Sequence, residues 1–236
     1  MSLGPTITET LNRARADLRM GVPVVLSSGG ASALAVAAEV LSSDRLAELR
    51  VMGPLTLAIT ARRAETLKAR AYDGDIARIA VPADVTAAWL AGVADPNDDL
   101  RSPMKGPFRS ERDGPADIHR AAIQLAKSAR LLPAAIVLPV ADGARMAREL
   151  GLTQLDMDRA APDIARATVL HPVVSARVPM EAAEAGRLHV FRPDDGGEEH
   201  YAIEIGQPPR DRPVLARLHS ACFTGDLLGS LKCDCG

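Results

Sequence analysis

The chain has 236 residues, of which 47% are hydrophobic and 25% are charged, and its formal net charge is −2. This length and composition are typical of a globular protein with one large or two modest domains. The small net negative charge gives no electrostatic support for a nucleic-acid-binding or membrane-surface protein. Aromatic residues make up only 3% of the chain, so the core must depend on Ala, Val, Leu and Ile.

No stretch of the sequence indicates a membrane or secreted protein. The longest apolar run, around residues 133–141, is too short to span a bilayer, and the N-terminus lacks the apolar segment of a signal peptide. The three cysteines show no disulfide pattern, which fits a reducing compartment. We therefore expect a cytoplasmic protein that binds neither membranes nor nucleic acid.

The first part of the chain alternates between strand patterns and helical patterns. Short β-branched or apolar runs predict strands at residues 22–26, 55–60, 76–81 and 134–139. Helical spacing, capping residues and Ala-rich composition predict helices at residues 7–20, 31–41, 44–51, 61–70, 84–93, 118–131 and 144–150. This alternation predicts an α/β domain with a mixed sheet, which we place at residues 1–165.

One long segment interrupts that alternation. Residues 94–117 are rich in Pro, Gly and charged residues, and they predict a loop. A loop of this length inside a compact domain is usually functional or mobile.

From about residue 166 the pattern changes to short strands separated by turn-forming residues. The expected strands are residues 173–178, 187–191, 200–205 and 214–219. We therefore expect residues 166–236 to begin a mainly antiparallel β domain. Its fourth strand would carry Arg217 and His219 on the same face, because alternate residues of a strand point the same way.

All three cysteines of the chain lie close together near its end. Ten residues separate Cys222 from Cys233, and one residue separates Cys233 from Cys235. Thiolates are soft ligands that suit zinc, and the last two cysteines are too close for a relaxed disulfide. Three protein ligands plus water make an open, catalytic zinc site, whereas His219 as a fourth ligand would close the site.

Residues 217–236 resemble the zinc motif of GTP cyclohydrolase II, the enzyme that opens riboflavin biosynthesis. The family pattern is Arg-x-His-Ser-Glu-Cys, then Thr-Gly-Asp, then Ser-x-x-Cys-Asp-Cys-Gly. The matching positions are Arg217, His219, Ser220, Cys222, Thr224, Gly225, Asp226, Ser230, Cys233, Asp234, Cys235 and Gly236. One position departs from the pattern, because Ala221 stands where the family has Glu.

This resemblance implies a function and a set of site residues. The implied zinc ligands are Cys222, Cys233 and Cys235, and the implied GTP-binding residues are Arg217, His219 and Ser220. The implied reaction opens the guanine imidazole ring of GTP and releases formate and pyrophosphate, with magnesium assisting at the triphosphate. The resemblance also implies a homodimer. The family's catalytic Asp, Arg and Tyr lie downstream of this motif, so we expect the catalytic residues beyond Gly236 and a chain that is part of a longer protein.

Residues 10–155 resemble 3,4-dihydroxy-2-butanone 4-phosphate synthase, which is often fused ahead of GTP cyclohydrolase II. The resemblance rests on the segments GVPVVL, AAEVLSSDRLAELR, DIHRAAIQLAKSARLLPAAIVLPV and DGARMARELGL. After its first strand the family has an acidic loop that binds magnesium and the sugar phosphate, whereas residues 27–32 carry no carboxylate here. Because magnesium usually requires one or two carboxylate ligands, we interpret this domain as a degenerate relative without that chemistry.

His119 matches a histidine of the synthase family, but the glutamate that accompanies it there is replaced. We interpret His119 as a structural residue at the start of a helix, with a satisfied hydrogen bond, rather than as a catalytic group.

Two other functions remain as alternatives. A non-catalytic regulatory protein, built from two degenerate riboflavin-enzyme domains, would bind GTP or a partner without turnover; Ala221 and the missing acidic loop favour it. A zinc-stabilised nucleic-acid module would require a basic face with exposed aromatic residues, which this composition does not support.

Overall fold

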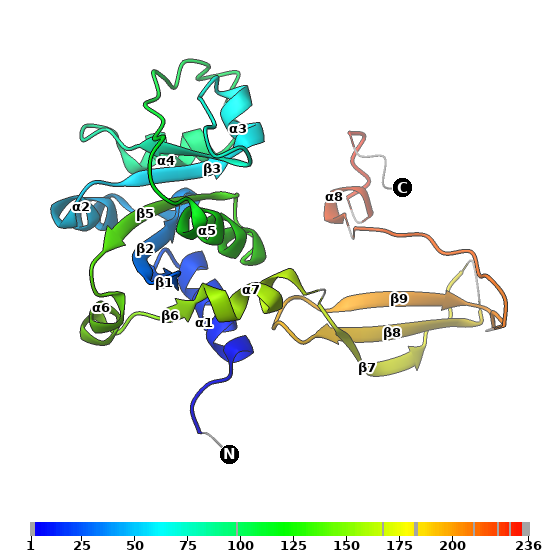
Figure 1. Ribbon diagram of the computed structural model, residues 1–236. Coiled ribbons are helices and arrows are strands. Elements are labelled where there is room, and N and C mark those ends of the chain that lie inside the picture. Colours follow the sequence, from blue (N-terminus) through cyan, green and yellow to red (C-terminus); the bar gives the residue numbers. More distant parts are fainter. Residues whose placement is uncertain are drawn as a thin grey trace. The chain divides into compact units, whose positions relative to one another are not determined.

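The computed structural model describes residues 3–97, 99–166, 168–181, 184–209, 211–220, 222–226 and 228–232. The chain divides into two compact units, unit 1 (residues 1–167) and unit 2 (residues 168–236), which are considered separately (Figure 1). Within the described ranges, no helix is both long enough and apolar enough to cross a membrane.

Unit 1 is built on a six-stranded sheet in the order β4-β3-β5-β2-β1-β6. The strands are β1 (Val24–Ser28), β2 (Ala31–Ala37), β3 (Thr56–Thr60), β4 (Ile76–Ala80), β5 (Ala134–Val140) and β6 (Gln154–Asp156). Strands β1 and β6 run parallel, and the other neighbouring pairs are antiparallel. The mixed α/β class predicted from the sequence is therefore confirmed.

Helices cover both faces of this sheet. They are α1 (Ile7–Arg19), the 3-10 helix η1 (Ala38–Val40), α2 (Ser43–Met52), α3 (Ala61–Thr66), α4 (Ala87–Ala94), α5 (Asp117–Ser128), α6 (Gly143–Leu150) and α7 (Met157–Ala165). A hydrophobic core lies on each face of the sheet, and successive residues of a strand point to opposite faces. Val24 and Ala33 pack with α1, α5 and α7, whereas Val25 and Leu34 pack with α2, α3, α4 and α6.

The segment 31–41 was expected to be helical from its composition, and this prediction is wrong. Gly29 and Gly30 form a two-residue turn with φ values of +56° and +82°, a combination that suits a tight hairpin. Strand β2 then pairs with β1 on one side and β5 on the other, and its residues from Ala33 onward are buried. Pairing and burial on both sides outweigh the helical preference of alanine here.

Asp158 of α7 holds this hairpin turn in place. Its carboxylate accepts a hydrogen bond from the Ser28 hydroxyl at 2.7 Å and another from the Gly29 N–H at 3.0 Å. The bond from Gly29, followed by that from Ser28, lowers the pKa of Asp158. The serine- and glycine-rich loop is therefore anchored by a carboxylate from a distant element.

The long loop after α4 is anchored by Asp99. Arg63 donates from Nη2 to Asp99 Oδ1 at 2.8 Å, and the ammonium of Lys105 also bonds to this carboxylate. The hydrogen bond from Arg63, and then that from Lys105, holds the pKa of Asp99 well below its usual range. Further along, the Glu111 N–H donates to the carbonyl of Arg78 at 2.8 Å, which aligns the end of the loop with β4.

Unit 2 contains a three-stranded antiparallel sheet in the order β7-β8-β9. Its strands are β7 (Leu170–Arg177), β8 (Gly186–Pro193) and β9 (His200–Ile205), and the one-turn helix α8 spans Phe223–Asp226. The predicted antiparallel class is therefore confirmed. Residues 214–219 form no strand, so the expected fourth strand, and the shared face it gave to Arg217 and His219, are wrong.

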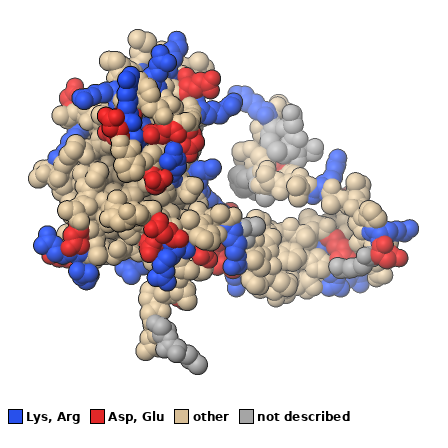
Figure 2. Space-filling model, viewed as in Figure 1, with Lys and Arg blue, Asp and Glu red and all other residues tan. Residues whose placement is uncertain are grey.

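Charged residues of both signs are interspersed on one face of unit 1 (Figure 2). On the face seen in Figure 2, Lys and Arg side chains alternate with Asp and Glu side chains over the same regions. This distribution agrees with the small net charge of the sequence.

We predict that Asp99→Asn destabilises unit 1. Arg63 and Lys105 would lose their shared countercharge, although their side chains are only 10% and 5% exposed. Breaking a buried ion pair costs roughly 3–5 kcal/mol, and we expect about 2 kcal/mol here because Asp99 is 24% exposed. Chemical denaturation of this variant, compared with Asp84→Asn at an exposed position, measures the loss. Equal stabilities of the two variants would contradict the anchoring role.

Candidate functional site

Cys222, the first cysteine of the motif, immediately precedes α8. The Gly225 N–H donates to its Sγ at 3.4 Å, and Oγ1 of Thr224 lies 3.2 Å from the same sulfur. The Asp226 N–H donates to the Cys222 carbonyl at 2.7 Å, which closes the helical turn. Polar hydrogens directed at a sulfur stabilise the thiolate, which is the form that binds a metal.

His219 lies beside the other end of this turn. Its Nε2 is 3.3 Å from Oδ1 of Asp226, a distance that allows the carboxylate to orient the imidazole. Arg217 and Ser220 belong to the same exposed segment. The structure therefore places three of the sequence-predicted residues, His219, Cys222 and Asp226, around one short turn.

The remaining cysteines, Cys233 and Cys235, lie outside the described residues. The convergence of three sulfurs therefore stays a prediction, and the part of the chain that the structure describes contains no group of three metal-ligating side chains. The surroundings of Cys222 do fit a zinc thiolate, because its sulfur already accepts an N–H donor from the backbone.

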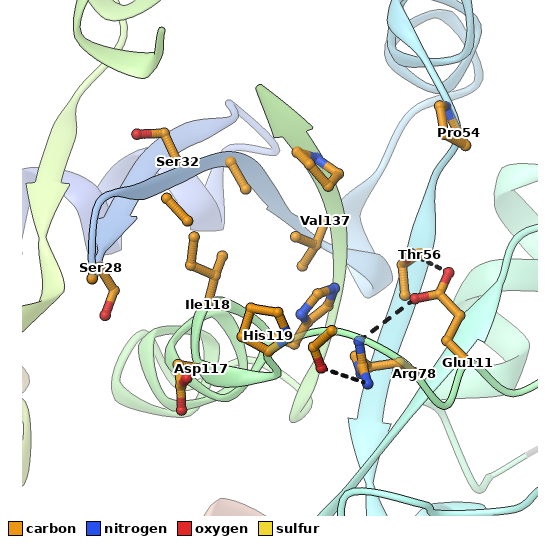
Figure 3. A pocket seen from close by; sticks show the side chains of 16 residues that line it. Ser28, Ser32, Pro54, Thr56, Arg78, Glu111, Asp117, Ile118, His119 and Val137 are labelled. Atoms are coloured by element: carbon orange, nitrogen blue, oxygen red, sulfur yellow. Dashed lines mark hydrogen bonds and ion pairs between the residues drawn. The ribbon is translucent and has the colours of Figure 1, made fainter. Parts of the chain in front are cut away.

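A second candidate site is a cavity in unit 1 between the sheet and the start of α5 (Figure 3). Its volume is about 440 Å³. The buried floor consists of Ala33 of β2, Thr56 of β3, Arg78 of β4, Val137 of β5 and His119 of α5. The exposed rim includes Gly29, Ala31, Pro54, Gly114, Pro115 and Asp117.

Strand register explains why these floor residues meet. Thr56 lies opposite Val137, and Arg78 lies opposite Ala58, which packs in the core beneath α5. Because alternate residues share a face, Thr56, Arg78 and Val137 point to the side of the sheet that α5 covers. Helix α5 begins at Asp117, and the cavity lies between its first turn and the sheet.

Arg78 is buried, and its guanidinium forms hydrogen bonds within the protein. Its Nε and Nη2 donate to the carboxylate of Asp73 at 2.8 and 3.0 Å. Its Nη1 and Nη2 also donate to the carbonyls of Asp113 and Gly114 at 2.9 and 3.3 Å. The positive charge of Arg78 is therefore compensated before any ligand enters.

Glu111 completes this polar side of the cavity. Its Oε1 accepts a hydrogen bond from the Thr56 hydroxyl at 2.9 Å, and its Oε2 lies 3.9 Å from Nη1 of Arg78. The Thr56 hydroxyl and the Arg78 guanidinium are thus both directed at a carboxylate (Figure 3).

His119 is the exception among these polar residues. It is only 7% exposed, and neither Nδ1 nor Nε2 has a hydrogen-bond partner within the described structure. Figure 3 shows its imidazole in the cavity wall between Ile118 and Arg78. The expectation that His119 starts a helix is confirmed, because it is in the first turn of α5, but the satisfied hydrogen bond expected for it is wrong.

Burial lowers the pKa of His119 to about 4, and the positive charge of Arg78 acts in the same direction. The negative charges of Glu111 and Asp73 oppose this shift without reversing it. His119 is therefore a neutral imidazole at neutral pH.

Thr56 and Arg78 are not among the site residues predicted from the sequence. The signal for Arg78 was present, because this arginine interrupts the otherwise apolar strand IARIA. A charged residue in a strand that is buried on both faces requires partners or a cavity, so it marks a polar site.

Comparison with known proteins supports the assignment of the motif. Residues 171–236 match the family model described as GTP cyclohydrolase II. GTP cyclohydrolase-2 of Azospirillum brasilense is 40% identical over 235 residues, which are 96% of this chain and 61% of that protein. The protein of the same name from Xylella fastidiosa strain Temecula1 is 33% identical over 99% of this chain and 57% of that protein. The chain thus spans about three fifths of the length of these relatives.

Two further similarities are to proteins with other names. The riboflavin biosynthesis protein RibBA of Phocaeicola vulgatus is 36% identical over 127 residues, which are 49% of this chain and 31% of that protein. A crystal structure of 3,4-dihydroxy-2-butanone 4-phosphate synthase from Candida albicans superposes with a TM-score of 0.50 and 17% identity, covering 66% of this chain and 97% of that one. The likeness to this synthase extends to the fold alone. The resemblance to GTP cyclohydrolase II found in the sequence is confirmed, and the resemblance to the synthase is confirmed in fold.

We predict that the imidazole of His119 titrates near pH 4 in the folded protein, against an ordinary value of 6.5. Between these two values the unfolded chain binds the proton more readily than the folded chain, so the free energy of unfolding falls as the pH falls. Histidine NMR signals across a pH series measure the pKa directly. In addition, the free energy of unfolding of the wild type should fall relative to that of His119→Leu from pH 7 to pH 4, because the variant lacks this titrating group. A titration of His119 near pH 6.5 would contradict this environment.

Proposed function

We propose that this chain contributes the zinc motif of a GTP cyclohydrolase II that acts in riboflavin biosynthesis. The reaction would open the guanine imidazole ring of GTP and release formate and pyrophosphate. The observation that carries this proposal is the family match over residues 171–236, which includes all three cysteines in the expected spacing.

In this proposal the sulfurs of Cys222, Cys233 and Cys235 hold a zinc ion. When bound, zinc supplies Lewis-acid activation of water for attack at C8 of the guanine. The Gly225 N–H and the Thr224 hydroxyl hold the Cys222 sulfur in its orientation. They also offset negative charge on the sulfur, since three thiolates bring more negative charge to a divalent ion than the ion neutralises.

The GTP-binding residues in this proposal are Arg217, His219 and Ser220. Arg217 has the planar fork of donors that suits bidentate contacts with phosphate or with a base edge. Oδ1 of Asp226 lies 3.3 Å from Nε2 of His219, and in this proposal it would orient the imidazole for contact with GTP. The hydroxyl of Ser220 can both donate and accept a hydrogen bond. Magnesium would accompany the triphosphate, as is usual for phosphate groups.

A non-catalytic regulatory protein that binds GTP or a partner is the second candidate. Ala221 replaces a family glutamate inside the motif, and residues 27–32 have none of the carboxylates of the synthase family. This candidate also predicts zinc and GTP binding, so binding does not separate the two. Formate release from GTP by the full-length natural protein separates them, because only the enzyme produces formate.

We predict that Cys233→Ser removes zinc and formate release together. A hydroxyl is a harder and much less acidic ligand than a thiol, so the remaining two sulfurs would not retain the ion. The zinc content, measured by metal analysis, should fall from about one ion per chain to none, since retention of the ion requires all three protein ligands.

Unit 1 provides the control for this variant. The thermal unfolding of unit 1, followed by circular dichroism, should be unchanged because its core is formed by residues of unit 1. Full zinc content in Cys233→Ser would refute the proposed ligand set, and loss of the unit 1 transition would argue against separate units.

We also predict that Arg217→Ala raises KM for GTP about tenfold or more, because a hydrogen bond to a charged group contributes roughly 1.5–3 kcal/mol. Arg177→Ala is the matched control, since Arg177 is an exposed arginine at the end of β7 in the same unit. Steady-state kinetics of formate release measure both variants. Equal KM values for the two would remove Arg217 from the substrate site.

A further inference from the structure

We propose that the cavity of unit 1 binds a small, uncharged heterocycle whose amide-like edge pairs with His119. This inference goes beyond the proposed function, because it concerns a site in unit 1 and does not depend on the zinc motif. The geometry of three features carries it, namely the unpartnered imidazole, the compensated charges and the apolar walls.

The first feature is the pair of unpartnered nitrogens of His119. The side chain is 93% buried, and it lines the cavity without a hydrogen bond at either nitrogen in the described structure. A buried polar group without a partner is unfavourable, so it marks a place where a ligand gains affinity by supplying the bond.

The chemistry of that partner follows from the neutral state of the imidazole. One of its nitrogens donates and the other accepts, and either nitrogen can hold the proton. A lactam or amide edge carries a donor and an acceptor side by side. It can therefore pair with the nitrogen that faces the cavity in either tautomer.

The second feature is the charge of the walls, which disfavours an anion. Among the described lining residues Arg78 is the one cation, and Asp73 together with the Asp113 and Gly114 carbonyls already binds its guanidinium. Glu111 and Asp117 contribute carboxylates to the same cavity. An anionic ligand such as a sugar phosphate would be repelled by these carboxylates and would find no cation to compensate its charge.

The third feature is the size and apolar character of the cavity. Its volume of about 440 Å³ lies within the range of sites for small organic ligands. Ala33 and Val137 form an apolar floor, and Pro54, Pro115 and Pro139 present further apolar surface. A flat ring system of one or two rings fits such walls, while the exposed rim leaves a path from solvent.

Binding of three probes to the full chain tests the proposal. Quinazolin-4-one is an uncharged bicyclic lactam, naphthalene has the same ring size without hydrogen-bonding groups, and ribose 5-phosphate is an anion. Methyl NMR signals of Ala33 and Val137 report binding in the cavity. We expect quinazolin-4-one to bind at least tenfold more tightly than ribose 5-phosphate and to shift these two signals.

Two variants separate the hydrogen bond from the cavity itself. His119→Leu should weaken quinazolin-4-one about three- to tenfold and leave naphthalene unchanged within about twofold, since a charge-free hydrogen bond is lost but the apolar walls remain. Ala31→Phe should weaken both bicyclic probes, because it fills the rim from an exposed position that folding tolerates. Ala88→Phe, at an exposed position of α4 outside the cavity, is the matched control and should change neither affinity.

The proposal is overturned if quinazolin-4-one does not bind, or if ribose 5-phosphate binds more tightly. It is also overturned if His119→Leu weakens naphthalene as much as the lactam, because the imidazole would then only shape the cavity. Each variant is accepted for this test only when its circular dichroism matches that of the wild type.

Discussion

The central sheet of unit 1 is buried on both faces, and this constraint decides most of the structure around it. Helices α1, α5 and α7 cover one face, while α2, α3, α4 and α6 cover the other. A strand in this position cannot place polar side chains toward water, so its sequence becomes a nearly continuous apolar run. Each polar residue in such a strand must be compensated by partners, or must face a cavity. In unit 1 both occur at the cavity beside α5, where polar strand residues have partners and also face the cavity.

Thr56 and Arg78 are the polar residues that this constraint singles out, and both lie on the face covered by α5. The loop that follows α4 returns to β4 and brings Glu111 and the Asp113 and Gly114 carbonyls to them. The partner of Thr56 and part of the hydrogen bonding of Arg78 therefore depend on a loop that Arg63, Asp99 and Lys105 anchor, whereas Asp73 binds Arg78 from the segment before β4. His119 is the one buried side chain of this described group that the loop leaves without a hydrogen bond. A wall with compensated charges and one unpartnered neutral group is suited to an uncharged ligand.

The sequence predicted those features that depend on local spacing, and it failed where distant residues decide. The capping box at Thr6 and the cap at Thr60 located α1 and α3, since both bonds lie within one turn. The segment 31–41 was assigned to a helix because alanine favours helices, but pairing with β5, about a hundred residues away, makes it a strand. Residues 214–219 show the opposite error, since alternation alone predicts a strand that no neighbour pairs with in the described structure. The cavity could not be predicted either, because its floor comes from five separate elements.

The candidate site of unit 2 lies within a short sequence segment, whereas the cavity of unit 1 is built from distant elements. A similarity to other proteins therefore carries different information for each unit. In unit 2 the groups that contact the Cys222 sulfur lie within a few residues of it in the sequence, so local spacing decides these contacts. In unit 1 the fold can persist while the polar residues of the cavity change, because packing of the sheet depends mainly on its apolar residues. A likeness in fold to 3,4-dihydroxy-2-butanone 4-phosphate synthase thus says nothing of the ligand. The ligand has to be argued from His119, Arg78 and Glu111, and their charges and hydrogen bonds favour a neutral molecule over a phosphate.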